Sequence, residues 1–280
     1  MQNAECRMPN PVSRITYHAS RSLRAFTMIE IAVSLAIIGF ALVAIIGVLP
    51  YGMNVQKDNR EETIINQDAT VFMNAIRNGA QGLDDLTNYV MAITNTVSFW
   101  QFGAPKPATT TSYGYTLTSS STTPQFPLIN GFRIVGLLST PKYVWLPSAK
   151  PPGFLSNNVT AYVRSMSGPA NEKFPQNNSS MQDLAFSYLM TSEVVPYGTN
   201  YYDLSWTADT NYAKVVNNLI TNLHDVRLLF RWPLRPQGKT GQGGQSFRTL
   251  VSGQLLPANE PGFGAVNLYY FQPRTYVKAP

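Results

Sequence analysis

The sequence predicts an α+β fold, in which one long N-terminal helix packs on an antiparallel β-sheet with long loops. Three observations predict it: an unbroken apolar segment at 26–49, helical spacing of apolar residues just after it, and short β-like runs between turn-rich stretches in the remaining chain. The composition agrees with this, because 13% of the 280 residues are charged, 12% are aromatic, and 20 prolines and 19 glycines are present. Such values are typical of a folded, loop-rich body rather than a disordered chain.

Positive charge is concentrated at the N-terminus. The formal net charge is +6, and residues 1–25 supply +3 of it through four arginines and one glutamate. The other 255 residues hold 17 basic and 14 acidic side chains without a basic stripe. We therefore expect no nucleic-acid partner, since nucleic-acid-binding domains gather basic residues on one face. The one cysteine, Cys6, also lies in residues 1–25, so the rest of the chain can form neither an internal disulfide nor a cysteine metal cluster.

The segment from Phe26 to Leu49 predicts a membrane-spanning helix. It has 24 residues with one ionisable side chain, and as a helix it would be about 36 Å long, more than the ~30 Å hydrocarbon core of a bilayer. This exceeds the apolar part of a secretory signal, which has about 7–15 residues. Four arginines precede the segment, whereas only Lys57 and Arg60 follow it closely. This bias predicts a single-pass membrane protein with a cytoplasmic N-terminus and the remaining residues outside. In a bacterial cell this places the helix in the inner membrane and the C-terminal domain in the periplasm.

Glu30 lies near the start of this segment. A carboxylate at the centre of a membrane helix costs about 2.5–3.5 kcal/mol on insertion scales, and less near an end, where the helix dipole partly offsets its charge. One interpretation is an interfacial side chain that reaches the lipid headgroups. The other is neutralisation by a second molecule: cleavage before Phe26 would create an α-amino group, and a neighbouring subunit shifted along the helix axis would present that amine to Glu30.

The segment "RAFTMIEIAVSLAIIGF", 24–40, resembles the N-terminal methylation segment of type IV prepilins and type II secretion pseudopilins. In that family prepilin peptidase removes a basic leader on the cytoplasmic side, the new terminal phenylalanine is methylated, and a glutamate stands fifth in the mature chain. The resemblance implies cleavage between Ala25 and Phe26, methylation of Phe26, and an assembly role for Glu30. The "AIIG" that ends at Gly39 also falls in the family's register. This sequence departs from the family in having Ala25 instead of glycine before the cut, and in having a leader longer than the shortest ones.

The resemblance implies a pilin-like form of the α+β fold, and a structural subunit of a type IV pilus or a type II secretion-like pseudopilus rather than an enzyme. Its implied partners are prepilin peptidase, other pilin or pseudopilin subunits, the inner-membrane assembly platform and the lipid bilayer, and it implies no cofactor. A mature length of 255 residues favours a large minor pilin or minor pseudopilin. Helix loosening on assembly is expected at Gly39, Gly47 and Pro50.

Two other functions stay open at this point. One is a periplasmic or extracellular binding or enzymatic domain on an uncleaved N-terminal anchor. The other, compatible with the filament subunit, is a carbohydrate- or surface-binding body on a pilin stem, for which Tyr201, Tyr202 and Trp206 are candidate residues.

The helical pattern continues beyond the apolar segment. Apolar residues recur at spacings of three and four at Ile65, Ala69, Phe72 and Ile76, and glycines follow at 79 and 82. One helix is thus expected from Phe26 to about Asn78, with Gly47 to Pro50 as the place for any bend. The chain is expected to divide into a cleaved leader at 1–25, an assembly helix at 26–49, its continuation at 50–79 and a globular body at 80–280.

Strands are expected in the body. Residues 104–127 predict a long exposed loop or irregular hairpin, and β-like runs lie at 131–139, 159–167 and 184–194. Residues 210–224 predict a short helix through Val215, Leu219 and Leu223. The strongest hairpin signal pairs 224–234 with 246–255 across the loop 235–245.

Other chemistry receives little support. The "QGKTGQGG" run lacks the first glycine of a phosphate-binding loop, since that position is Pro233, and it predicts a hairpin tip. His224 beside Asp225 predicts a surface or hydrogen-bonded histidine, because neighbouring strand residues point to opposite faces. Calcium ligation by Asp84 with Asp85, or by Asp203 with Asp209, is weighed against solvated loop aspartates, and the latter interpretation is preferred because no EF-hand spacing is present. We therefore expect neither a catalytic nor a metal site.

Overall fold

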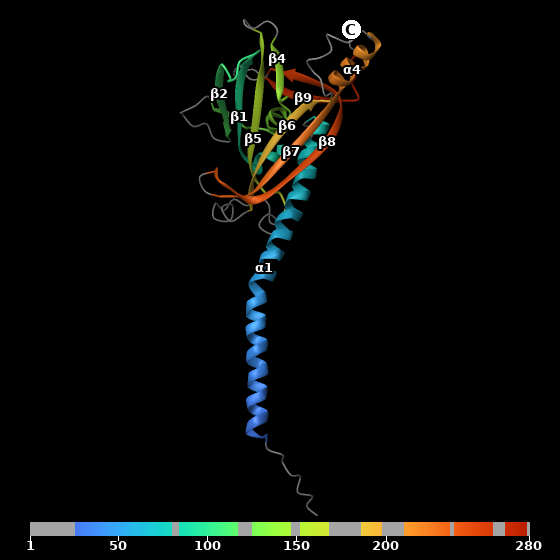
Figure 1. The fold of residues 1–280 in the computed structure, drawn as a ribbon. Coiled ribbons are helices and arrows are strands. Elements are labelled where there is room, and N and C mark those ends of the chain that lie inside the picture. Colours follow the sequence, from blue (N-terminus) through green and yellow to red (C-terminus); the bar gives the residue numbers. More distant parts are fainter. Residues whose placement is uncertain are drawn as a thin grey trace, which may run out of the picture. The chain divides into compact units, whose positions relative to one another are not determined.

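The structure is a computed structural model that describes residues 26–79, 84–116, 125–146, 152–167, 186–197, 210–235, 238–259 and 267–278. The chain divides into two compact units, residues 1–56 and 57–280. The described elements are one long helix, two shorter helices, one 3-10 turn and nine strands (Figure 1). This is an α+β arrangement, as the sequence predicts.

Helix α1 covers Met28–Asn78, with Pro50 inside it. All side chains from 26 to 60 are exposed, whereas the apolar face predicted further along is buried. The helix stops at Gly79, which has a φ of +67° and donates its N–H to the Ile76 carbonyl oxygen at 3.3 Å. The predicted end near Asn78 is therefore confirmed. The buried residues of α1 are Ile64, Ile65, Asp68, Ala69, Phe72, Ala75 and Ile76.

A nine-stranded sheet forms the body, in the order β3-β2-β1-β5-β6-β7-β8-β9, with β4 also paired to β5. Neighbours pair antiparallel except β2 and β3, which are parallel. The sheet is curled, as Figure 1 shows. The strands are β1 (Val90–Gln101), β2 (Thr109–Thr116), β3 (Gln125–Pro127), β4 (Tyr143–Leu146), β5 (Gly153–Arg164), β6 (Ser187–Pro196), β7 (Leu223–Leu234), β8 (Thr240–Ala258) and β9 (Leu268–Pro273).

The run 131–139 was predicted as a strand, and this prediction is wrong. It forms helix α2 (Gly131–Leu138), which is capped by the Asn130 side chain accepting the Arg133 N–H at 2.9 Å. Ile134, Leu137 and Leu138 are fully buried at helical spacing. A short apolar run fits a strand or a helix equally by composition, and the capping asparagine is the local signal that favours the helix.

Two other expectations are refined by the structure. Residues 104–127 were predicted as a long exposed loop or an irregular hairpin. They contain β2, which pairs antiparallel with β1 outside this range, and β3, which pairs parallel with β2, so these two strands do not form a hairpin with each other. The expected loop 235–245 is shorter, because β8 already begins at Thr240. Gly243 faces Trp232 across the β7–β8 pair, and a Cβ at Gly243 would lie 2.5 Å from the indole ring. Gly243 is thus a strand residue whose lack of a side chain leaves room for the Trp232 ring.

The core lies between the buried face of α1, helix α2 and one face of the sheet. Strands β1, β5, β6 and β7 contribute alternate residues to it, which is the period-two pattern of a sheet covered on one side. The predicted short helix is also present, as α4 (Thr210–Asn222).

Strand β9 is held against helix α2 by an aromatic contact. Tyr270 of β9 stacks on Phe132 of α2 with ring centroids 4.0 Å apart, and its hydroxyl donates to the Phe132 carbonyl oxygen at 3.0 Å.

Candidate functional site

The start of α1 is a capping box built from Thr27 and Glu30. The Thr27 backbone N–H and hydroxyl each donate to Glu30 Oε2, at 2.8 and 2.9 Å. In return, the Glu30 N–H donates to Thr27 Oγ1 at 3.3 Å. This is the reciprocal pattern in which a threonine and a glutamate three residues later satisfy donors that the first helical turn leaves unpaired. The carboxylate of Glu30 therefore has hydrogen-bond partners within its own chain.

Sequence reasoning missed the part played by Thr27. The signal was present, because Thr-x-x-Glu ahead of an apolar run is a recognisable helix start. Capping supplies a local reason for a carboxylate at this position, in addition to the two interpretations given above. It also leaves Glu30 exposed, so a cation from outside the chain has access to it.

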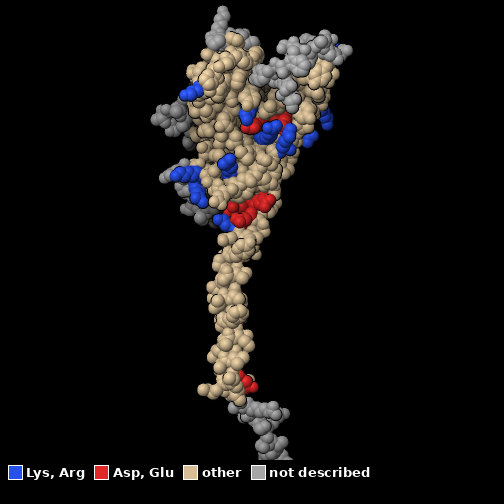
Figure 2. All heavy atoms as spheres, viewed as in Figure 1, with Lys and Arg blue, Asp and Glu red and all other residues tan. Residues whose placement is uncertain are grey.

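Between residues 31 and 56 the surface of α1 is mostly apolar. Residues 31–56 contain no Lys, Arg, Asp or Glu, and the large apolar side chains among them are mostly half to three-quarters exposed. This is one helix long and apolar enough to cross a membrane. Figure 2 shows this part of α1 without charge apart from one acidic patch at its start. Such a surface is compatible with a membrane anchor.

Three of the other residues predicted for processing and assembly lie on the same helix. Gly39 and Gly47 have open space where a Cβ would be, and Pro50 lies within the helix. Phe26 precedes the helix and is 81% exposed. Ala25 lies outside the described residues.

His224 and Asp225, the neighbouring pair considered for catalysis, have different surroundings in the structure. His224 is buried, contrary to the surface or hydrogen-bonded histidine expected, and its Nδ1 has no hydrogen-bond partner among the described residues. Burial lowers its pKa to about 4. Asp225 accepts hydrogen bonds from Arg227 and from Arg248, at 2.6 and 2.8 Å. Burial tends to raise the pKa of Asp225, but these two guanidinium groups outweigh it and hold the pKa below its usual value.

Of the aspartates considered for calcium, the structure describes Asp84 and Asp85. Asp84 Oδ1 accepts the Gly131 N–H at 3.2 Å and so links the turn Asp84–Asn88 to the start of α2. Asp203, Asp209 and the aromatic residues Tyr201, Tyr202 and Trp206 lie outside the described residues. Within the described ranges, no group of three or more His, Cys, Asp or Glu side chains has the arrangement of a metal site.

The tip of the β7–β8 hairpin fits the predicted turn. Gly238 has a φ of +73°, and the Arg235 N–H donates to the Lys239 carbonyl oxygen at 2.7 Å. On the face of the body seen in Figure 2, basic and acidic side chains are interspersed.

Comparisons with protein-family models, with curated proteins and with solved structures found no match to this chain.

Proposed function

We propose that this chain is a structural subunit of a type IV pilus or a type II secretion-like pseudopilus, processed by prepilin peptidase and assembled through its N-terminal helix. One observation carries the proposal: the exposed apolar surface of α1 is interrupted by a single ionisable side chain, Glu30, which stands fifth from Phe26. A helix that is apolar all round needs lipid or other apolar helices as its surroundings. A pilus subunit is surrounded first by lipid, in the bilayer, and then by the apolar helices of other subunits, in the filament.

Glu30 is the pairing site in this proposal. After removal of the leader, the α-amino group of Phe26 in one subunit approaches the Glu30 carboxylate of the next, and the two opposite charges neutralise each other away from water. A buried pair of this kind is strongly orienting, because either charge alone is costly to bury. It would fix the axial shift between neighbouring helices. The large body then favours a minor subunit.

The decisive experiment is determination of the mature N-terminus. The full chain is expressed with an active prepilin peptidase, and with an inactive peptidase as control, and its intact mass and N-terminal peptide are measured by mass spectrometry. We expect loss of 25 residues and a single N-methyl group on Phe26 with the active enzyme alone. Ala25→Gly, which restores the family's residue, is expected to raise the processed fraction. An intact leader in both cells would overturn the proposal.

A second candidate function is a binding domain on an uncleaved anchor in the inner membrane. The observation that favours it is the capping box, because Thr27 already satisfies Glu30 without a partner subunit. The two functions predict different locations for the chain. A filament subunit is recovered in sheared pili or in pseudopili, whereas an anchored domain stays in the membrane fraction.

A further inference from the structure

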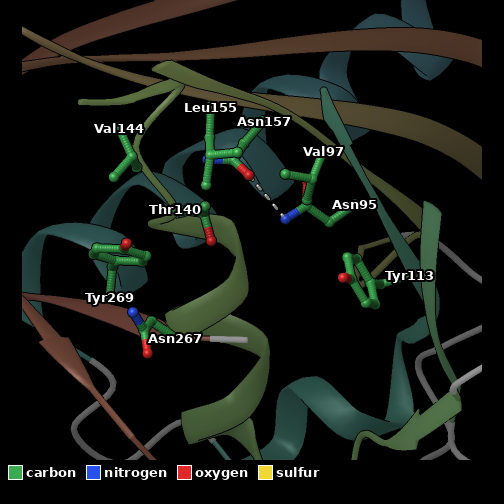
Figure 3. Close-up of a pocket in the computed structure, with 9 residues that line it drawn as sticks. All are labelled: Asn95, Val97, Tyr113, Thr140, Val144, Leu155, Asn157, Asn267 and Tyr269. Carbon is green, nitrogen blue, oxygen red and sulfur yellow. Dashed lines mark hydrogen bonds between the residues drawn. The ribbon is translucent and has the colours of Figure 1, made fainter. Parts of the chain in front are cut away.

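Strands β1, β2, β4 and β5 lie side by side (Figure 1), and their two faces differ in character. One face is internal: Figure 3 shows Asn95, Val97, Leu155 and Asn157 around a pocket of about 150 Å³. Asn95 is only 1% exposed, so a ligand in this pocket could not reach its amide. Successive strand residues point to opposite faces, and the residues that alternate with these four therefore form the outer face. This outer face is the accessible side of the four strands.

Three aromatic residues lie directly opposite one another on the outer face, one on each of three adjacent strands. Phe154 of β5 pairs with Trp100 of β1 on one side and with Trp145 of β4 on the other. The Trp100 and Phe154 rings are nearly parallel, at 7°, with centroids 6.4 Å apart. Two further rings join this aromatic row, since Phe102 lies 4.8 Å from Trp145 and Tyr143 lies 5.7 Å from Phe154, centroid to centroid. The row is open to solvent, because Phe102 is 49% exposed, Tyr143 41% and Trp145 38%.

Rows of small polar side chains continue the same face beside the aromatic row. The hydroxyls of Thr96 on β1 and Ser112 on β2 are hydrogen-bonded at 3.2 Å, and those of Ser98 and Thr110 are also 3.2 Å apart. Ser156 of β5 lies opposite Ser98 and extends the second of these rows. In each pair one hydroxyl donates to the other, which leaves a proton on the accepting hydroxyl and lone pairs on both. The rows can therefore both donate and accept hydrogen bonds.

The absence of charge limits the kind of partner. Strands β1, β2 and β4 and residues 153–163 of β5 contain no Lys, Arg, Asp or Glu, and Lys142, which precedes β4, pairs with Glu193. A nucleic acid or an anionic lipid surface would find no cations along these strands. A protein partner fits less well, because serine is depleted in protein–protein interfaces. The face instead suits a neutral polymer that offers C–H groups to the aromatic row and hydroxyls to the polar rows.

We propose that the outer face of β1, β2, β4 and β5 binds a neutral polysaccharide of linked pyranose rings, such as cellulose or chitin. A pyranose ring has C–H groups on its faces, and the negative faces of aromatic rings attract these weakly positive groups. Its edge carries hydroxyls that match the Thr96–Ser112 and Ser98–Thr110 pairs. Adjacent strands are about 4.8 Å apart, so three strands give an aromatic row about 10 Å long. This is longer than one sugar ring and favours a chain over a monosaccharide. The inference concerns residues 57–280 alone and does not depend on filament assembly.

The test measures retention of the full chain, in phospholipid nanodiscs, on microcrystalline cellulose and on chitin. Empty nanodiscs are the blank, and depletion of the protein from solution is followed at rising protein concentration. We expect retention on at least one of the two polymers. It should persist in about 0.5 M NaCl, because no charged side chain of the face contributes to it. Retention on neither polymer, or retention that is lost in salt, would overturn the proposal.

Trp145→Ala assigns the binding to this face. It removes one ring of the aromatic row, so the apparent affinity should fall about tenfold, whereas Trp145→Phe should keep most of it. Thr110→Val keeps the branched shape of a strand residue and removes one hydroxyl. That variant should bind about threefold more weakly with an unchanged melting temperature.

The matched control is Tyr276→Ala, which removes a ring that is 63% exposed but lies outside this face. Equal affinities for the Trp145→Ala and Tyr276→Ala proteins would contradict the assignment. Analytical ultracentrifugation of the same proteins tests the other occupant. Self-association that Trp145→Ala abolishes, without retention on either polymer, would mean that the face contacts a second copy of the chain instead.

Discussion

The Tyr188 hydroxyl donates a hydrogen bond of 3.0 Å to the Asp68 carboxylate, and this contact joins strand β6 to helix α1. Asp68 is fully buried and accepts three further hydrogen bonds: from the Met166 N–H at 3.0 Å, from the Ser167 N–H at 3.2 Å and from the Ser167 hydroxyl at 2.8 Å. Burial raises the pKa of Asp68, although these donors oppose the shift. One side chain of α1 thus holds two separate parts of the body.

Removal of this carboxylate should strongly destabilise the body. Asp68→Ala leaves four donors without their acceptor, and we expect the free energy of unfolding to fall by about 3 kcal/mol or more. Tyr188→Phe should cost only about 1 kcal/mol, because Asp68 keeps its other donors. Urea unfolding of the full chain in nanodiscs, followed by tryptophan fluorescence, measures both. Asp58→Ala, at an exposed position of the same helix, is the control. Equal losses for Asp68→Ala and Asp58→Ala would refute this role.

Gly79 is expected to tolerate no side chain. Its φ is +67°, and a Cβ would lie 2.6 Å from the Phe271 carbonyl oxygen of β9. Gly79→Ala therefore adds a steric clash to backbone strain, and we expect a loss of about 2–3 kcal/mol in thermal or urea unfolding. Gly103→Ala separates the two effects, since Gly103 has a φ of +77° with open space around it. That variant should lose only about 1 kcal/mol. If the two losses were the same, contact with Phe271 would be irrelevant.

His224 should make stability depend on pH. It is buried against Phe271, with ring centroids 5.3 Å apart, and its pKa is lowered to about 4 from 6.5. Between these values the unfolded chain takes up a proton that the folded chain does not, so stability falls as the pH is lowered through this window. The full effect is about 3 kcal/mol at pH 4 and vanishes above pH 7.

The His224→Phe variant separates this effect from that of carboxylates, which titrate in a similar pH range. Phenylalanine preserves an aromatic ring against Phe271 but carries no proton. The difference in unfolding free energy between the two proteins, measured at pH 7.5, 6, 5 and 4, should change steadily in favour of the variant as the pH falls. A constant difference would show that the histidine titrates normally in the folded state.

The elements predictable from sequence are those whose signal is local and long. Helix α1 and its end at Gly79 follow from apolar spacing and a terminating glycine, and the β7–β8 hairpin follows from alternation along Val226, Leu228 and Phe230. Strand β1 was not predicted. Its polar residues, such as Asn95, are buried by strands distant in the chain, which local alternation cannot reveal.

The start of α1 and the pocket in the body also differ in how far they could be predicted from sequence. The α1 start is contiguous in sequence, so Phe26 and Glu30 could be identified together, and Thr27 was readable by the same rule. The pocket unites Asn95, Thr140 and Tyr269 from three separate segments. Only the curl of the sheet and the return of β9 beside α2 bring them together, and no spacing along the chain records that arrangement.

The last prediction separates the two roles of Glu30, capping and pairing. Glu30→Gln keeps an acceptor for the Thr27 N–H and hydroxyl, since glutamine also completes a capping box, but it removes the negative charge. Thr27→Ala keeps the charge and removes the side-chain half of the cap, at a cost of about 1 kcal/mol to the first turn. If an amine of a neighbouring subunit pairs with Glu30, incorporation into filaments should be lost in Glu30→Gln and should persist in Thr27→Ala.

Incorporation is measured by quantitative immunoblotting of sheared filaments against the membrane fraction, with leader removal verified by mass for each variant. Gly39→Ala, with open space around its Cβ, serves as a control for substitution within the same helix. The opposite ranking, with Thr27→Ala defective and Glu30→Gln normal, would mean that Glu30 acts as a helix cap alone. A capping role requires only an acceptor three residues into the helix, whereas pairing requires its charge, and the two substitutions remove these properties one at a time.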